Sequence, residues 1–149
     1  MHIDSIRSDA VRNIAQLTGR ALMSALFIWS GYGKLVAPAD TEAYFASIGL
    51  PFPELARVLA VFVELGGGLA LLLGLEARLV AVALAVWCIL TALAGHSDFA
   101  DATARIQFMK NVSMAGGFIF IASFGAGAYT AKAVMPRFRW SRLYRGEER

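Results

Sequence analysis

The sequence predicts an all-α polytopic membrane protein, a four-transmembrane-helix bundle with a short interfacial helix between the first two helices. Three observations support this fold class. Hydrophobic residues make up 58% of the 149-residue chain and charged residues only 17%, which is too apolar for a soluble domain of this size. Four apolar stretches fill most of the chain, and the loops between them are too short to fold separately. Three stretches hold or adjoin an ionisable residue that lipid disfavours.

The lengths of the apolar stretches match the thickness of a bilayer. Each is about 17 to 23 residues long, and at about 1.5 Å of rise per residue it spans a hydrocarbon core of roughly 30 Å as a helix. They cover approximately residues 14–36, 55–75, 79–95 and 112–131. We therefore expect an N-terminal cytoplasmic segment at residues 1–13, a membrane domain at 14–131 and a basic cytoplasmic tail at 132–149.

The first stretch has an alternative interpretation as a secretory signal. Arg7, Arg12 and Arg20 precede or begin the apolar run, and Ala37 to Ala39 resembles a small-residue cleavage site. A lysine, Lys34, stands just before that site, and the run is longer than the apolar core of a signal peptide. These two features favour a retained helix.

The positions of Lys and Arg predict the orientation in the bacterial inner membrane. Short cytoplasmic connections are enriched in these residues, so the basic ends of this chain predict that both termini are cytoplasmic. Ten of the 14 positive residues lie there or in the second connection: Arg7, Arg12, Arg20, Arg78, Lys132, Arg137, Arg139, Arg142, Arg145 and Arg149. The aromatic and basic tail is expected on anionic lipid headgroups rather than on nucleic acid.

The first outer connection is the longest, and it predicts a short helix on the membrane surface. The helix is expected from Thr41 to Ile48, because Gly49 follows it and Pro51 comes soon after. Pro53 suits the first turn of the next helix. The aromatic residues of this segment can enter the acyl boundary. Such a helix either covers a cavity or anchors the loop.

Four ionisable residues are expected to share a chamber in the outer half of the membrane. With this topology, Lys34 is late in an outbound helix, and Glu64 lies about 14 Å into an inbound one. His96 ends an outbound helix and Lys110 begins an inbound one. Because a carboxylate near the midplane costs on the order of 3 kcal/mol, Glu64 needs a partner, and Lys34 or Lys110 can provide it. These four are the candidate catalytic residues.

Each of these residues also has a purely structural interpretation. A buried pair of Glu64 with a lysine can fix the helix register without any chemistry. His96 can cap a helix end, and both lysines can extend to the interface. All of these alternatives stay open.

The other residue patterns exclude several classes of site. The glycines around Gly67 lie within a membrane helix without a preceding strand, so they indicate close helix packing rather than phosphate binding. Cys88 is the only cysteine, so no intramolecular disulfide forms. With two histidines, His2 and His96, we expect no metal or haem site within one chain.

Several of these segments together resemble the DoxX family. They are Arg20, the run Gly31-Tyr32-Gly33-Lys34-Leu35, the run Gly49-Leu50-Pro51, and Glu64-Leu65-Gly66-Gly67-Gly68-Leu69 with Gly74. His96 and Lys110 fall where that family has polar residues in its third and fourth helices. The resemblance extends over about residues 17 to 131.

The resemblance implies a four-helix membrane protein with a link to quinones. Some members are described as subunits of thiosulfate:quinone oxidoreductases, and others are connected with oxidative-stress defence. It implies a quinone as the cofactor, held by Lys34, Gly67 and Lys110. The short single domain lacks the extra soluble subunit of such enzymes, so we expect any electron transfer to need a bound lipid-soluble carrier or a partner protein.

Two functions therefore follow from the sequence. In the first, the chain is a quinone-linked redox component, where Lys34 and Lys110 hold an anionic or carbonyl group of a small lipophilic ligand. Glu64 then relays a proton and His96 assists at the outer mouth. In the second, the chain is a small non-catalytic transport or scaffold subunit whose polar cluster locks the helices together. Homo-oligomers are expected, because four helices enclose little volume.

Overall fold

The computed structural model describes the backbone of residues 2–134 and the side chains of residues 7–133. The basic tail that was expected on lipid headgroups lies at residues 135–149, outside the described residues. Within the described part every regular element is a helix, which confirms the all-α prediction. The elements are α1 (His2–Val36), α2 (Pro38–Ser47), α3 (Pro53–Val61), η1 (Phe62–Gly66), α4 (Gly67–Leu73), α5 (Ala77–Gly95), α6 (Ala102–Phe124) and α7 (Ala131–Val134).

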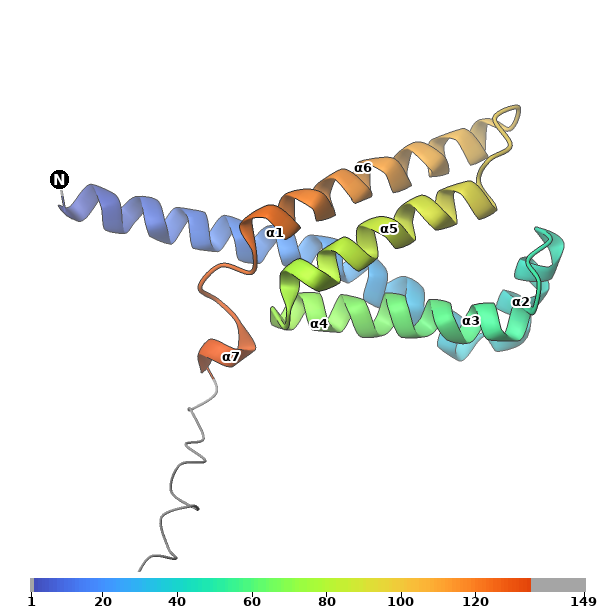
Figure 1. Ribbon diagram of the computed structural model, residues 1–149, viewed down its shortest axis with the longest axis horizontal. Coiled ribbons are helices and arrows are strands. Elements are labelled where there is room, and N and C mark those ends of the chain that lie inside the picture. Colours follow the sequence, from blue (N-terminus) through green and yellow to red (C-terminus); the bar gives the residue numbers. More distant parts are fainter. Residues whose placement is uncertain (1, 135–149) are drawn as a thin grey trace, which may run out of the picture.

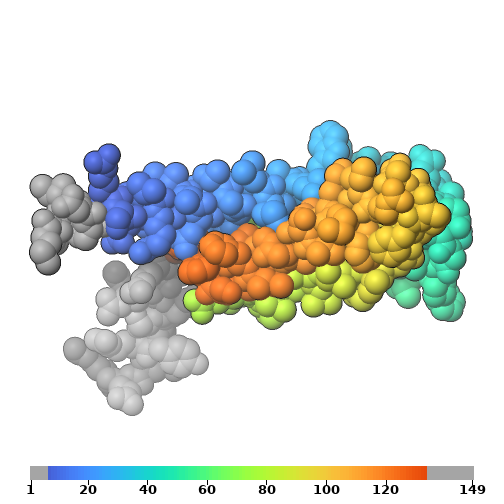
Figure 2. Space-filling view, turned by 90° about the horizontal axis from the view of Figure 1, so that it is seen from above, coloured from blue at the N-terminus to red at the C-terminus, as the bar shows by residue number. Residues whose placement is uncertain are grey.

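The long helices lie side by side, and they diverge toward one end (Figure 1). α3, η1 and α4 form one continuous rod that packs along α1, while α5 and α6 form a hairpin with the most extensive helix contact. The end with α2 and the α5–α6 connection is called the α2 end, and the opposite end is called the α7 end. The space-filling view shows α1 running along α6, with the beginning of α1 projecting past the other helices (Figure 2).

Two helix boundaries differ from those expected. The fourth apolar stretch was expected at residues 112–131, but α6 runs from Ala102 to Phe124, and an irregular segment with positive φ at Gly125 and Gly127 follows. The first turns of α6 contain polar residues, so the apolar stretch alone placed the start of this helix too late. The first helix extends back to His2, so no break separates the N-terminal segment 1–13 from the membrane helix.

The short helix α2 and its surroundings agree with the turn residues in the sequence. α2 covers Pro38–Ser47, close to the expected Thr41–Ile48, and none of its residues is buried. Gly49 follows with φ 76°, a conformation that glycine adopts without strain. Pro53 is the first residue of α3, where its missing N–H costs nothing.

Within the described residues, two helical rods are long and apolar enough to cross a membrane, Pro53–Leu73 with 21 residues and Ala77–Gly95 with 19. The mean hydropathy of the most apolar 18-residue window is 1.9 in the first and 2.2 in the second. Only 22% and 33% of their most apolar windows are buried inside the protein. Phe62 and Leu79 are 75% and 71% exposed. Exposed apolar surfaces of this kind mark contact with lipid or with another protein.

Gly31 of α1 lies directly against the backbone of Leu65 in η1. A Cβ at Gly31 would lie 2.5 Å from the backbone nitrogen of Leu65. Gly68 is similarly confined, since its Cβ would lie 3.0 Å from Ile28 Cγ1. The prediction of close packing through the glycines around Gly67 is confirmed at Gly68, whereas the contact at Gly31 was not predicted. Gly66 and Gly116 differ, because nothing lies within 4 Å of a Cβ there.

Arg20 joins three segments at the α7 end. It was counted among the positive residues of the membrane surface, but the side chain is only 1% exposed. Its guanidinium donates to the backbone oxygens of Ala126, Leu72 at 3.1 Å and Tyr129 at 2.7 Å. A cation is favourable there because the last carbonyls of a helix carry partial negative charge. Arg20 therefore ties α1 to the end of α4 and to the segment after α6.

The turn between α4 and α5 also belongs to the α7 end. Gly74 has φ 70° and ends α4 with a reverse turn in which Leu75 N–H donates to Ala70 O. Its role is thus a helix cap as well as close packing. The hydrogen bond from Lys132 of α7, and then the charge of its ammonium, lower the pKa of the exposed Glu76.

We expect Gly31→Ala to lower the free energy of unfolding by about 1 to 3 kcal/mol, because the new methyl group forces α1 and η1 apart. Cys88 is fully buried and is the only cysteine, so a thiol-reactive fluorogenic dye reports unfolding during heating in detergent. Gly116→Ala is the matched control in α6 and should melt like the unmodified protein. Equal melting of both variants would contradict the packing argument.

Replacement of Arg20 by Met should destabilise the α7 end by on the order of 3 kcal/mol, since it leaves three backbone oxygens without their donor. Hydrogen exchange at residues 125–130 should accelerate in this variant. Arg12→Met is the control, because Arg12 is exposed and only pairs with Asp9 on its own helix. The same exchange rates in both variants would show that Arg20 does not hold this segment.

Candidate functional site

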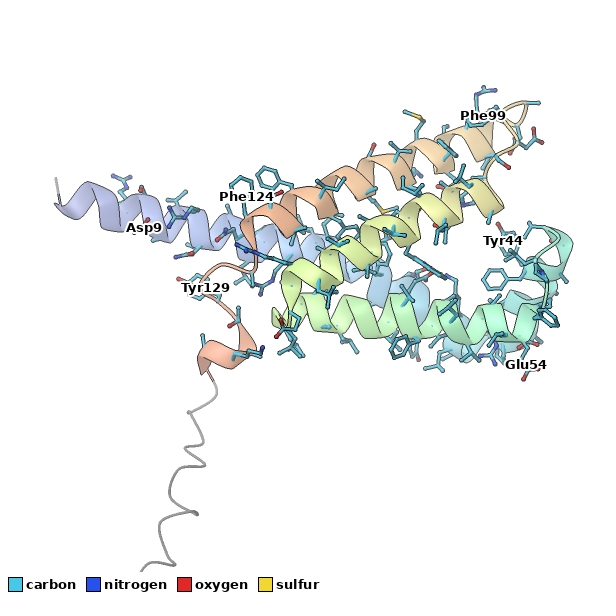
Figure 3. The ribbon with its side chains drawn as sticks, viewed as in Figure 1. Asp9, Tyr44, Glu54, Phe99, Phe124 and Tyr129 are labelled. Atoms are coloured by element: carbon cyan, nitrogen blue, oxygen red, sulfur yellow. The ribbon has the colours of Figure 1, made fainter. Side chains whose placement is uncertain are left out.

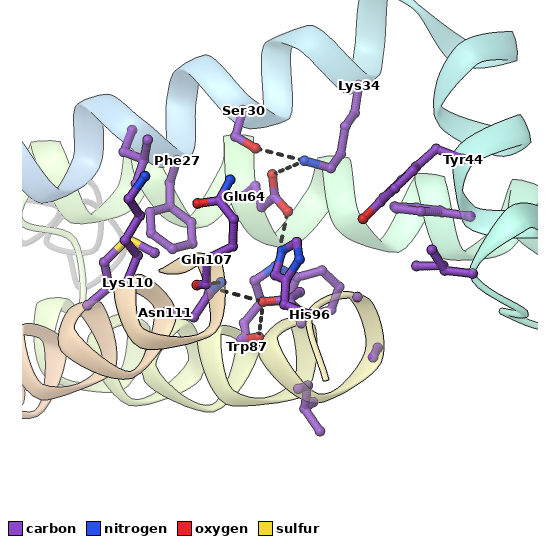
Figure 4. A pocket seen from close by; sticks show the side chains of 18 of the residues that line it. Phe27, Ser30, Lys34, Tyr44, Glu64, Trp87, His96, Gln107, Lys110 and Asn111 are labelled. Atoms are coloured by element: carbon purple, nitrogen blue, oxygen red, sulfur yellow. Dashed lines mark hydrogen bonds and ion pairs between the residues drawn. The ribbon is translucent and has the colours of Figure 1, made fainter. Parts of the chain in front are cut away.

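A pocket of about 1220 Å³ occupies the α2 end, where the α5–α6 hairpin diverges from α1 and α3 (Figure 4). Apolar side chains from α1, α3, α5 and α6 form most of its surface, and α2 closes it at the end of the molecule. Its polar lining residues are Ser30, Lys34, Tyr44, Glu64, Trp87, Thr91, His96, Arg105, Gln107, Lys110, Asn111 and Ser113.

Glu64 is the most buried charged residue of the pocket. Its side chain is 7% exposed, and both carboxylate oxygens accept hydrogen bonds. Lys34 Nζ donates to Oε2 at 2.7 Å, and Trp87 Nε1 donates to Oε1 at 3.1 Å. The carboxylate therefore connects α1, η1 and α5. It also satisfies the indole N–H, which would otherwise be unpaired in an apolar setting.

A single π-helical turn holds Glu64. η1 covers Phe62–Gly66, and its wider hydrogen-bonding pattern changes the direction of the side chains relative to a regular α-helix. Such turns are rare and often occur at functional sites. Sequence reasoning missed this turn, because no residue type or spacing in a continuous apolar run specifies it.

The position of Lys34 follows from the packing of α1. It lies three residues after Gly31, so both are on the same face of α1. Because Gly31 brings α1 against Leu65, the next turn of α1 comes beside Glu64. Lys34 Nζ also donates to Ser30 Oγ at 2.7 Å, one turn earlier. Of the two lysines that could pair with Glu64, Lys34 is the one in contact.

His96 and Lys110 line the same pocket without contacting Glu64. His96 is the residue at the end of α5, as predicted, and its backbone N–H donates to Ala92 O. Lys110 was expected at the start of a helix, but it lies about two turns into α6. Within the described residues neither side chain makes a hydrogen bond or an ion pair. Figure 4 shows Lys110 extending from α6 in the direction of α1.

Gly67 does not belong to the pocket lining. It was predicted to hold a cofactor with Lys34 and Lys110, but a Cβ at Gly67 would lie 3.1 Å from Leu84 Cδ2 of α5. Its backbone faces a helix contact instead. The four charged or titratable candidates are therefore brought together around one pocket, and the glycine is not.

Sequence reasoning also missed a polar stripe on the α5–α6 wall. Thr91 Oγ1 lies 3.3 Å from Asn111 Oδ1, and Asn111 Nδ2 donates to the backbone oxygen of Gln107 at 3.0 Å. Gln107, Lys110 and Asn111 are spaced by three and four residues, so they share one face of α6. This spacing within an apolar helix is a signal that could have identified them.

Tyr44 of α2 completes the mouth of the pocket. Figure 3 shows it at the same end as Phe99 of the α5–α6 connection, pointing from α2 toward the interior. A Cβ at Gly95 would lie 3.3 Å from the Tyr44 hydroxyl, so α2 contacts the end of α5 next to His96. The short helix thus covers one end of the pocket.

Comparisons with known proteins give relatives along nearly the whole chain. The family model that matches is DoxX, over residues 15–97. Inner membrane protein YqjF of Escherichia coli (strain K12) is 37% identical over 130 residues, which are 87% of this chain and 98% of that protein. Inner membrane protein YphA of the same organism is 36% identical over 124 residues, or 80% and 89% of the two chains. No solved structure matches.

The extent of these matches and the apolar outward faces of the helices lead to one conclusion. The chain belongs to the DoxX family and is an integral membrane protein.

Proposed function

We propose that this protein binds a small lipophilic molecule of the quinone type in the pocket and acts as a quinone-linked redox or oxidative-stress component of the inner membrane. The observation that carries the proposal is the group of Lys34, Glu64 and Trp87 in contact within a large, mostly apolar cavity. An apolar pocket with few polar groups at defined places is typical of sites for small ligands.

The residues present fit a quinone. Such a molecule has a flat apolar ring with two oxygen acceptors on opposite sides. Hydrogen-bond donors reach the pocket from two sides, with Lys34 on α1 and Lys110 and Asn111 on α6. Phe27 and other apolar side chains form most of the remaining lining. When bound, a quinone supplies the capacity to accept two electrons and two protons, and the electrons would come from a partner subunit.

The chain itself would bind, orient and handle protons. Lys34 is placed to donate to a ligand oxygen, since its ammonium has three donors and two of them contact Ser30 and Glu64. Glu64 is the carboxyl group that can take up or release a proton at Oε2. The apolar walls limit access of water. Lys110 and His96 would contact the ligand from α6 and from the mouth.

We also propose a topology with four membrane-crossing segments: α1, the rod from α3 to α4, α5 and α6. α2 would then lie at the outer surface, and both termini would be cytoplasmic. Support comes from the Lys and Arg residues near the helix ends, because Arg7, Arg12, Arg78 and Lys132 lie at the α7 end, against Arg57 and Arg105 at the α2 end.

Quinone binding is measurable through Trp87. In a Trp29→Phe/Trp140→Phe background it is the only tryptophan, and decylubiquinone added to the protein in lipid nanodiscs should quench it saturably. Lys34→Met and Glu64→Gln should each weaken the affinity about ten-fold, the equivalent of about 1.4 kcal/mol, because each removes one charged contact. Lys132→Met is the control, because Lys132 is an exposed residue of α7. This variant should bind decylubiquinone with the affinity of the unmodified protein.

Because removal of one partner of a buried pair destabilises proteins, the Lys34→Met/Glu64→Gln double variant is measured as well. If this variant is folded and still binds the quinone with unchanged affinity, the pair is a helix lock and the redox proposal fails. Proteoliposome flux that depends on Glu64 without quinone binding would instead favour the transport interpretation.

The proposed topology predicts which sites react from outside. In a Cys88→Ala background, Asp98→Cys in the α5–α6 connection should react with a membrane-impermeant maleimide on intact bacterial cells. Ala133→Cys in α7 should react only after the cells are opened. Both positions are exposed on the protein, so burial does not explain a difference. Labelling of residue 133 in intact cells would reject the cytoplasmic C-terminus.

A further inference from the structure

We propose that the pocket selects amphiphiles with an anionic headgroup, and that Lys110 is the residue that recognises the charge. The ligand would be an acyl-chain molecule ending in a carboxylate or a phosphate. This inference rests on the proposed function only in that both use the same pocket. It adds a sign of charge and a discriminating residue, neither of which the quinone proposal requires.

The first argument is the balance of charge around the pocket. Three side chains that line it are cationic, Lys34, Arg105 and Lys110, and one is anionic, Glu64. The carboxylate of Glu64 contacts Lys34, so within the described residues the other two cations have no carboxylate partner. With His96 neutral, the lining has a net charge of +2. Both of these cations are exposed on the protein, and where their surroundings are lipid an unpaired charge is costly, so an anionic ligand would compensate it.

The second argument is that Arg105 and Lys110, the two cations without a carboxylate partner, differ in their hydrogen bonds. Arg105 donates to the backbone oxygens of Phe99 at 2.7 Å and Ala100 at 3.5 Å, so it is already held by the α5–α6 connection. Lys110 has no hydrogen bond or ion pair within the described residues, and all its donors are available. It extends toward the α1 side of the pocket (Figure 4). A ligand headgroup in the pocket would therefore contact Lys110 first.

The third argument is the rim of the pocket, which is apolar and open sideways. Several large apolar residues line the pocket and are still half-exposed: Leu26, Leu59, Leu90, Ile106 and Met109. Because the outer surface of these helices faces lipid, the cavity is continuous with the acyl region. A chain can then remain at the rim while its headgroup reaches inside. Lipid tails are as apolar as the rim, so the chain contributes little selectivity and the headgroup decides binding.

The test compares ligands with the same chain and different headgroups. The Trp87-only protein in phosphatidylcholine nanodiscs is titrated with 2-bromododecanoate or with 2-bromododecanol, since bromine quenches tryptophan on contact and this bromine lies next to the headgroup. We expect the carboxylate to quench saturably and to bind at least ten-fold more tightly than the alcohol. A brominated phosphatidylglycerol is the third ligand. Quenching by this lipid alone would assign the site to a membrane lipid headgroup, and quenching by the carboxylate would assign it to a free amphiphile.

The role of Lys110 is tested with Lys110→Met, which keeps the length of the side chain and removes the charge. The preference for the carboxylate over the alcohol should fall about ten-fold, while Lys132→Met leaves it unchanged. Equal affinity for the two headgroups, or an unchanged preference in Lys110→Met, would overturn the inference. If decylubiquinone still quenches Trp87 in either of these cases, the proposed function is unaffected. Carboxylate selection without any quinone quenching would reject the proposed function and keep this inference.

Discussion

The contact between Lys34 and Glu64 is the interaction on which the architecture of the α2 end depends. Two opposite charges removed from water are tolerated only while they stay in contact, because either one alone would be a buried, uncompensated charge. Their helices must therefore approach within side-chain reach. Gly31 makes this approach possible, since any larger residue would collide with the backbone at Leu65. The glycine and the ion pair thus act together: the glycine sets the distance between α1 and η1, and the two charges fix the register of these helices.

The two ends of the molecule differ in how their cations are surrounded. At the α7 end the guanidinium of Arg20 is surrounded by backbone oxygens from two other segments, and little space remains. At the α2 end the hairpin diverges from α1 and α3 and leaves a cavity, and one lysine there, Lys110, has no partner among the described residues (Figure 1). Hydrogen bonds to backbone oxygens use the donors of the Arg20 guanidinium, whereas the ammonium of Lys110 beside the cavity keeps its donors available to a ligand. The contacts of Arg20 therefore stabilise the α7 end, and the cavity at the α2 end is where we propose that a ligand binds.

Sequence reasoning predicted the features that follow from residue type alone. Hydropathy indicated the helices, Pro53 and Gly49 marked helix ends correctly, and depth along the helices indicated that four titratable residues face one pocket. The features it missed depend on tertiary contacts. The π-helical turn at Glu64 and the pairing with Trp87 both require α1 and α5 to be in place. Charge alone suggested a surface position for Arg20, because its backbone acceptors lie 52 to 109 residues away in the chain.

The divergence of the helices explains why the polar residues are concentrated at one end. Where α5 packs closely on η1 and α4, small or branched side chains such as Ala81 and Leu84 fill the contact, and a charge would have neither space nor solvent. Where the hairpin separates from α1, long side chains can reach into the cavity from both walls. Lys34 and Lys110 approach it from opposite sides, and only Lys34 meets a carboxylate. Together with Arg105, the unpaired Lys110 gives the pocket an excess of positive charge over its single carboxylate, and this excess is the basis on which we propose that the pocket selects anionic ligands.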